Sequence, residues 1–202
     1  MLRGLILHRD KRVPNCDQEM AQALAKLDQT NPQRCELFMA GLETIYGSPK
    51  DQIAAFDRVQ GRSELKGWMP VHKQMLRLRA PDTAEAAATE LVKLADAAPD
   101  AGTRATIHQL LSQYYVGTQQ YEKAVTYCRK VLEVDANNFA ALNNAAFILA
   151  KHLKQPADAL AMAEKAVEIV PNSPTALDTL GTVHLELKNC AKAEEFLKKA
   201  VD

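Results

Sequence analysis

The chain has 202 residues, of which 47% are hydrophobic and 25% are charged, and its formal net charge at pH 7 is zero. Binding to nucleic acid or to an anionic membrane surface would need an excess of Lys and Arg, so the balanced charge argues against both. No segment approaches the roughly 18 consecutive apolar residues of a membrane-spanning helix, and we expect no membrane insertion. Because the sequence shows no secretory signal, we expect a cytoplasmic location, with a periplasmic one left open if the native N-terminus lies elsewhere.

Residues 1–62 contain two degenerate repeats. Each repeat is predicted to consist of two amphipathic helices joined by a turn. In residues 1–32, apolar residues at helical spacing flank a turn at Pro14, and Pro32 closes the pair. Residues 33–62 repeat the scheme, with DQIAAFDRV from Asp51 as the second helix. Gln52 stands there at a position where a small residue would pack better. We therefore predict two degenerate helix pairs.

Residues 63–100 are irregular, because Gly67 and Pro70 restrict where a helix can begin. An Ala-rich helix follows and is expected to end in the region 99–102, which contains Pro, Asp and Gly. We interpret this segment as a third degenerate pair. Trp68 is expected to pack in the core, since most Trp residues are largely buried, and a contact surface is the alternative.

Residues 101–202 carry the same scheme three times, over 105–138, 139–173 and 174–202. Ala124, Ala159 and Ala193 stand at one place in the three copies. Their small side chains let the second helix approach the first closely, while Leu and Tyr fill the neighbouring gaps. A period of this length predicts an all-α solenoid in which each helix pair packs on its neighbours.

The copies resemble the tetratricopeptide repeat (TPR) family, whose 34-residue unit is a pair of antiparallel helices. The third copy matches the family's large, small and aromatic positions with Leu177, Leu180, Gly181, Ala193, Phe196, Leu197 and Ala200. Ser112 and Ala146 replace the glycine in the other two copies, and the second copy has one extra residue in its turn. The resemblance implies a right-handed superhelical solenoid of about five TPR-like units, degenerate within 1–100 and well formed within 101–202.

The resemblance also implies a concave face, lined by the first helix of each pair, that binds a partner protein or an extended peptide. The residues expected there are mostly amides and hydroxyls, namely Gln109, Gln113, Asn143, Asn144, Phe147, Asp178, Thr179 and Thr182. Amides can hydrogen-bond a peptide backbone as donor and as acceptor. An aromatic ring offers a flat apolar contact. The alternative is that this face is only solvated.

No spacing of residues indicates catalysis. The five histidines form no metal-binding motif, the four cysteines include no Cys-x-x-Cys pair, and no glycine-rich phosphate loop occurs. His108 and His184 fall at packing positions of a first helix, so we expect both in the core. We expect no catalytic residue, no metal site and no cofactor.

The sequence therefore favours a non-catalytic scaffold for protein–protein interaction. A second hypothesis is a recruiting or regulatory segment of a larger enzyme, or of an export or assembly machine, whose active domain lies outside this chain. A third, RNA recognition by a helical repeat, is disfavoured by the neutral charge. The last repeat has no polar closing helix, and self-association through its apolar face near Val201 is a further expectation.

Overall fold

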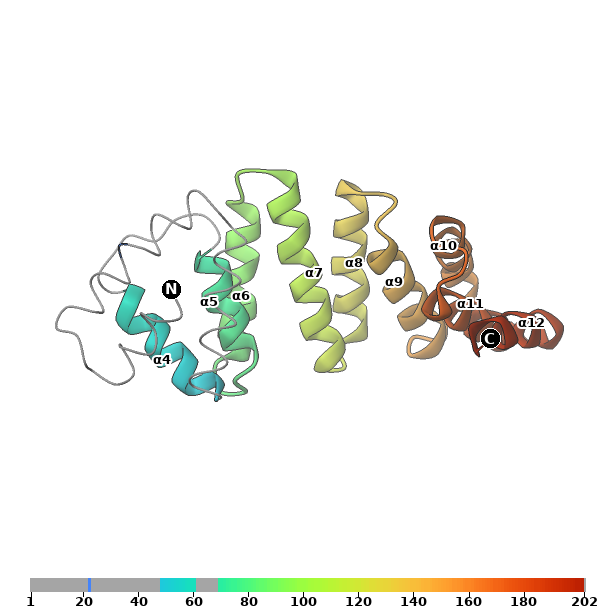
Figure 1. Ribbon diagram of the computed structural model, residues 1–202, viewed down its shortest axis with the longest axis horizontal. Helices are drawn as coiled ribbons and strands as arrows, with labels where there is room; N and C mark the ends of the chain where they lie inside the picture. Colours follow the sequence, from blue (N-terminus) through green and yellow to red (C-terminus); the bar gives the residue numbers. More distant parts are fainter. Residues whose placement is uncertain (1–21, 23–47, 61–68, 202) are drawn as a thin grey trace. The chain divides into compact units, whose positions relative to one another are not determined.

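A computed structural model describes residue 22, residues 48–60 and residues 69–201, which are helical with turns between the helices and contain no strand (Figure 1). The chain divides into two compact units, Met1–Leu94 and Ala95–Asp202. The predicted pair 1–32, nearly all of the first helix of the pair 33–62, and Trp68 lie outside the described residues. The repeat boundaries expected from the sequence within residues 1–100 stay a prediction.

The first unit contains α4 (Pro49–Gln60), α5 (Met69–Leu78) and most of α6 (Ala84–Asp96). Ser48 precedes α4, and its hydroxyl oxygen accepts a hydrogen bond from the backbone N–H of Asp51 at 3.2 Å, as an N-cap residue does. Helix α4 packs against α5. The apolar positions of the three helices are buried, with Phe56 and Leu91 at 1% exposure or less.

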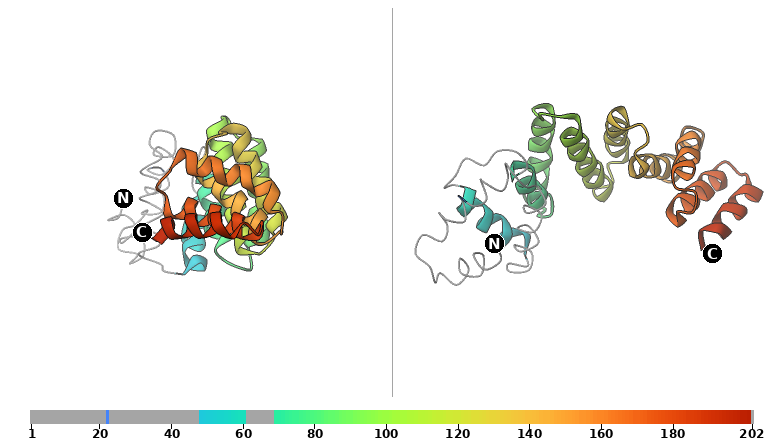
Figure 2. Two further views of the ribbon diagram at one scale, coloured as in Figure 1. Left: turned by 90° about the vertical axis from the view of Figure 1, so that its right-hand side faces the viewer. Right: turned by 45° about the horizontal axis from the view of Figure 1, so that its top comes forward.

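The second unit contains the last two residues of α6 and three helix pairs, which are α7 (Ala101–Gly117) with α8 (Tyr121–Val134), α9 (Phe139–Lys151) with α10 (Pro156–Ile169), and α11 (Pro174–Glu186) with α12 (Cys190–Val201). The members of each pair pack antiparallel (Figure 1). Each pair also packs on the next, through α8 with α9, α10 with α11, and α9 with α11 (Figure 2). Within this unit the fold is a stack of helix pairs, as the sequence repeat predicted.

Side-chain caps fix where the first helix of each pair begins. Asp100, Asn138 and Ser173 accept hydrogen bonds from the backbone N–H three residues along, at 2.8, 3.1 and 3.3 Å. The cap at Asp100 starts α7 at Ala101. The sequence predicts that residues 99–102 end the preceding helix, because Asp and Gly also mark helix ends. In the structure α6 ends at Asp96, and Gly102 lies inside the first turn of α7.

The turn inside each pair contains one residue with a left-handed backbone. These residues are Gln119, Lys154 and Lys188, with φ of 58°, 54° and 61°. Around Lys188, the N–H of Lys188 donates to Leu185 O and the N–H of Asn189 donates to His184 O, both at 2.9 Å. This pattern is a Schellman motif, which satisfies the last carbonyls of a helix. The turn at Lys154 is wider because the second copy has one extra residue there.

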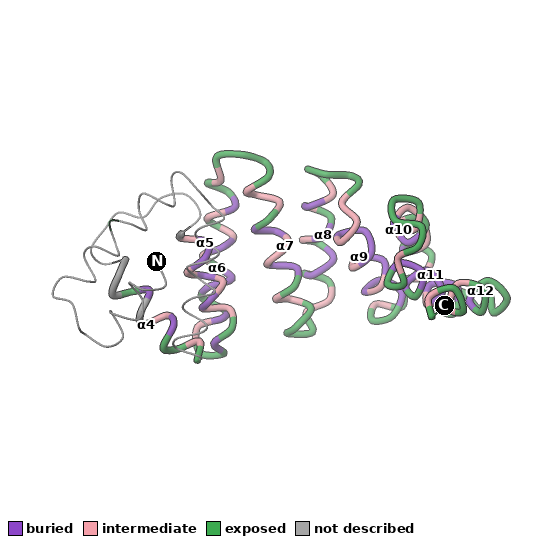
Figure 3. Tube along the Cα trace, in the orientation of Figure 1, coloured by how far each residue is buried: buried purple, intermediate pink, exposed green. Residues whose placement is uncertain are grey.

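The core of the second unit runs along the inner faces of its helices (Figure 3). Ala124 and Ala159 are fully buried and Ala193 is 2% exposed, so the three equivalent alanines occupy the tight helix contacts that the sequence predicted. His108 and His184 are also buried, at 7% and 4% exposure, which confirms their packing role.

Candidate functional site

The eight residues expected on the first-helix face lie on α7, α9 and α11 and differ in exposure. Gln113 and Asp178 are exposed to solvent. A second group is half-buried and comprises Gln109, Asn144, Phe147 and Thr182. The residues on α9 and α11 lie on helices that pack together, whereas α7 reaches α9 through α8. These six side chains can touch a ligand while remaining part of the helix surface.

Asn143 and Thr179, by contrast, are buried, at 5% and 2% exposure. The Oδ1 atom of Asn143 is buried and has no hydrogen-bond partner among the described residues. An unpaired buried carbonyl oxygen costs about 1–3 kcal/mol relative to a paired one. Asn143 therefore has a buried acceptor oxygen to which no described residue donates a hydrogen bond.

An aromatic cluster holds Phe147 in place. The ring of His152 stacks on Tyr121, with centroids 4.0 Å apart and an angle of 12° between the planes. Phe147 meets the same His152 edge-on at 5.7 Å. Tyr121 and His152 belong to different repeats, so their spacing in the sequence does not predict that they meet. The only signal was an aromatic residue at the start of one second helix and a histidine at the end of the next first helix.

An ion pair links the second repeat to α11. Lys154 Nζ lies 2.9 Å from Glu186 Oε1, and Lys154 comes from the turn after α9. The hydrogen bond from Lys154 holds the pKa of the Glu186 carboxyl below its usual value. Asp178, one turn into the same helix, is exposed. The face therefore carries amides, hydroxyls and carboxylate groups, and it suits a ligand that offers backbone N–H donors.

Of the two cysteines among the described residues, Cys128 is buried and Cys190 is exposed. The Sγ atom of Cys128 and the Oγ atom of Ser112 form a buried hydrogen bond of 3.0 Å. Burial raises the pKa of the Cys128 thiol, so the nucleophilic thiolate is disfavoured. Within the described residues, no group of three or more His, Cys, Asp and Glu side chains could hold a metal ion. The helices described there also include none with the length and apolar character needed to cross a bilayer.

Comparison with known families matches residues 105–138 and 138–202 to the tetratricopeptide repeat. These are the residues whose helix pairs, small contact positions and turns recur in the structure. Over residues 105–202, the chain belongs to the tetratricopeptide repeat family. No curated protein matches the sequence.

Solved TPR structures share the fold at low sequence identity. MamA AMB-1 is 18% identical with a TM-score of 0.62, and the similarity covers 80% of this chain and 85% of that one. A MamA RS-1 double mutant is 16% identical with a TM-score of 0.67, covering 88% and 92%. YrrB, described as a TPR protein with an unusual peptide-binding site, is 16% identical with a TM-score of 0.62, covering 98% and 89%. The all-α solenoid of TPR-like helix pairs is thus confirmed.

The last TPR unit has a second surface, which we call the C-terminal face. It is a shallow depression of about 510 Å³ lined by Leu185, Cys190, Ala193, Glu194, Leu197, Lys198 and Val201. Leu185 is 53% exposed and Val201 is 84% exposed. The residue of α9 that corresponds to Leu185 is Ala150, which is fully buried. In the preceding TPR unit this position is covered, and in the last one it meets solvent.

Proposed function

We propose that this chain is a non-catalytic scaffold that binds a partner protein or an extended peptide through the first-helix face of α7, α9 and α11. The observation that carries the proposal is that the polar side chains of Gln109, Gln113, Asn144, Asp178 and Thr182 on these three helices are exposed or half-buried. Their oxygen atoms can accept hydrogen bonds from the backbone N–H groups of a peptide. Membership of the TPR family supports protein binding, and the peptide-binding site attributed to YrrB supports a peptide as one form of partner.

The neighbouring side chains suit the same ligand. Asn144 and Gln113 can each donate to a peptide carbonyl and accept from a peptide N–H. Phe147, held by His152, offers a fixed apolar surface for one side chain of the ligand. A fixed aromatic ring loses little conformational freedom on binding, so its contact area contributes efficiently to affinity. The buried Thr179 supports the helix contact and is not part of the proposed contact surface.

The test is a pull-down with the full chain in which a groove variant is compared with a surface variant. The groove variant carries Asn144→Ala, Phe147→Ala and Asp178→Ala. The matched control carries Glu122→Ala, Arg129→Ala and Glu168→Ala, which are exposed positions on the second helices α8 and α10. We expect a protein retained by the wild type and by the control to be lost from the groove variant, with unchanged helical circular dichroism in all three.

A crosslinking experiment then places the partner directly. A photoreactive amino acid is introduced at Gln113 and, separately, at Glu168, both of which are exposed. The proposal expects the retained protein to crosslink at position 113 and not at position 168. Equal retention by the groove variant and the wild type, together with crosslinking only at position 168, would refute binding through the first-helix face.

The C-terminal face favours self-association as a second function. The corresponding residue of the preceding repeat, Ala150, is buried, and the exposed Leu185 and Val201 leave apolar area for a second copy of the chain. Self-association is tested by analytical ultracentrifugation of the wild type and of the double variant Leu185→Lys, Val201→Lys. We expect the wild type, and not the double variant, to form a larger species as its concentration rises. A wild type that stays monomeric at high concentration would refute self-association through this face.

Two further expectations from the sequence stay predictions. One is that this chain recruits or regulates an active domain elsewhere in a larger enzyme or assembly machine. The other is the cytoplasmic location. Neither changes the proposed contact surface, because both concern what the scaffold is attached to or where it works.

A further inference from the structure

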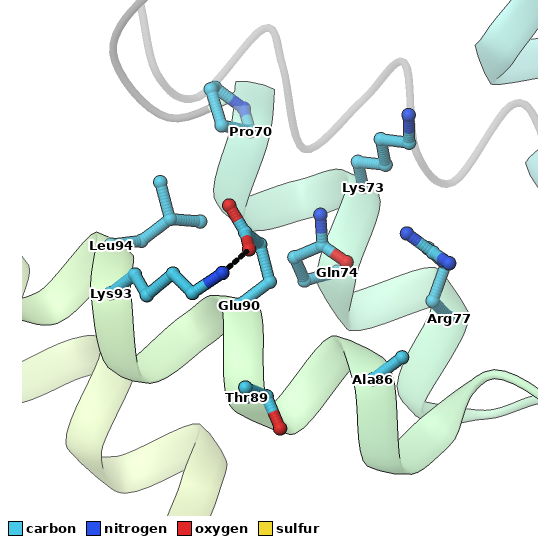
Figure 4. Close-up of a pocket in the computed structure, with 9 residues that line it drawn as sticks. All are labelled: Pro70, Lys73, Gln74, Arg77, Ala86, Thr89, Glu90, Lys93 and Leu94. Carbon is cyan, nitrogen blue, oxygen red and sulfur yellow. Dashed lines mark hydrogen bonds and ion pairs between the residues drawn. The ribbon is translucent and has the colours of Figure 1, made fainter.

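A cleft lies between α5 and α6 in the first unit and is lined by none of the residues of the first-helix face. Its volume is about 580 Å³, within the range of about 300–1,000 Å³ typical of small-ligand sites. Figure 4 shows its two walls. One wall is formed by Pro70, Lys73, Gln74 and Arg77 of α5, and the other by Ala86, Thr89, Glu90, Lys93 and Leu94 of α6. On each helix the residues follow at spacings of three and four, so they share one face.

The charged side chains of the cleft are paired, with one exception. Lys73 Nζ lies 2.7 Å from Asp57 Oδ1 of α4. Lys93 Nζ lies 3.1 Å from Glu90 Oε2, and both residues belong to the α6 wall. Arg77 is half-buried and makes no ion pair with any described residue. A guanidinium group is the side chain best suited to bind a carboxylate with two parallel hydrogen bonds. The cleft therefore holds one cation whose charge no described carboxylate balances.

Gln74 supplies a second unsatisfied group beside Arg77. The residue is 6% exposed, and its Oε1 atom is buried with no hydrogen-bond partner among the described residues. In Figure 4 its side chain is drawn with Glu90 to its left and Arg77 to its right. A buried polar atom without a partner is rare in folded proteins and needs an explanation. A donor supplied by a ligand would provide one, and a backbone N–H is the donor that any peptide offers.

We propose that this cleft binds an acidic peptide segment, with an Asp or Glu carboxylate of the peptide on Arg77 and a peptide backbone N–H on Gln74 Oε1. The two groups needed, an anion and a neutral donor, occur together on one short stretch of an acidic peptide. A simple inorganic anion satisfies Arg77 but offers little to an acceptor oxygen. Pro70, Ala86 and Leu94 give the apolar stems of the peptide's side chains a surface to pack on.

This site does not depend on the proposed function of the first-helix face. It lies in the other compact unit and uses a different kind of recognition, since a cation and an acceptor face the ligand. On α5, Lys73 and Arg77 are half-buried and stand apart from the core positions Val71 and Leu76, whereas Gln74 is buried. Substituting Arg77 therefore changes the cleft and leaves the core packing in place.

The test is an NMR titration of the isotopically labelled full chain with two probe peptides. The acidic probe is acetyl-Leu-Glu-Ala-Asp-amide, and the neutral probe replaces its two acids with Gln and Asn. We expect the acidic probe to shift the signals of α5 and α6 and the neutral probe to bind at least about tenfold more weakly, as loss of a charge-assisted pair implies. Equal affinity for the two probes would overturn the proposal.

Variants assign the binding to the two groups. Arg77→Gln is expected to weaken the acidic probe about tenfold. Arg129→Gln removes the same charge from an exposed position of α8 and is expected to leave affinity unchanged. An equal loss of affinity in Arg77→Gln and Arg129→Gln would mean that only the net charge of the protein matters. That result would refute the proposed site.

Gln74→Leu separates binding from folding. It removes a buried unpaired acceptor, so the thermal midpoint should stay the same or rise while affinity for the acidic probe falls about fivefold. An affinity that is unchanged in this variant contradicts the role of Gln74. In a last measurement, inorganic phosphate is added to the peptide complex at matched ionic strength. Displacement of the peptide by phosphate at the peptide's own concentration would show a general anion site and refute the peptide assignment.

Discussion

Gly181 of α11 lies so close to Leu197 of α12 that a Cβ at position 181 would come within 2.7 Å of Leu197 Cγ and 3.3 Å of its backbone nitrogen. In the first TPR pair the same two places hold Ser112 and Cys128, whose Oγ and Sγ atoms are 3.0 Å apart. The space between the helices of a pair is thus shared differently in each repeat. A larger residue on the second helix goes with a smaller one on the first.

Gly181→Ala should destabilise the protein. Overpacking costs about 1–3 kcal/mol, and the better helix propensity of Ala returns about 1 kcal/mol, so we expect a net loss of about 1 kcal/mol in urea unfolding. The control is the same substitution in a Leu197→Ala background, where the space has been opened. There Gly181→Ala should be neutral or stabilising. A similar loss in both backgrounds would show that the close approach is not the cause.

The buried histidines predict that stability falls with acid. Burial lowers the pKa of His108 and of His184, and nearby cations lower them further, Lys130 and Arg104 for His108 and Lys192 for His184. The unfolded chain, with His pKa near about 6.5, then binds more protons than the folded chain. This contribution is fully present above about pH 6.5 and is lost as pH falls through the lower folded values.

The predicted loss of stability in acid is measured by urea unfolding at pH 7.5 and at pH 5.5. The wild type is compared with the double variant His108→Leu, His184→Tyr. We expect the free energy of unfolding to fall more between the two pH values in the wild type. Carboxylate titration affects both proteins alike and cancels in the comparison. An equal fall in the two proteins would mean that the histidines do not carry the effect.

The left-handed turn residues predict a stabilising change. Gln119 and Lys188 have φ of 58° and 61°, a region that costs most side chains about 1–2 kcal/mol and glycine very little. Since glycine also has more freedom to lose on folding, we expect Gln119→Gly or Lys188→Gly to raise the free energy of unfolding by about 0.5 kcal/mol. Gln119→Ala is the control and should not stabilise. Stabilisation by Ala to the same extent would contradict the backbone explanation.

The fold of residues 105–202 was predictable because its signals are local and repeated. Alanines at one register position set the helix contact, and Pro156 and Pro174 stand in the first turns of α10 and α11, where proline is favoured. The start of α7 was not predictable in the same way. Asp100 and Gly102 can end one helix or begin the next, and the hydrogen bond from the N–H of Thr103 to Asp100 decides between them.

The candidate site was predictable only in part. Helical register correctly places Asn143 and Asn144 side by side on one helix, but their burial differs because α11 packs on α9, and one helix's sequence does not encode how closely its neighbour approaches. The α5–α6 cleft was missed for a similar reason. Gln74 and Arg77 are polar residues among apolar ones in the sequence, and the cleft also needs the α6 wall, which this stretch of sequence does not contain.

The distribution of buried positions along the second unit has a consequence for how it opens. Eight residues of α9 are buried, against Ala193 alone in α12. In a stack where each pair contacts only its neighbours, local stability follows such differences, and opening proceeds from the weakest end. Amide hydrogens of α12 should therefore exchange first and those of α9 last, so the terminal helix can detach and redock while the centre of the array stays folded.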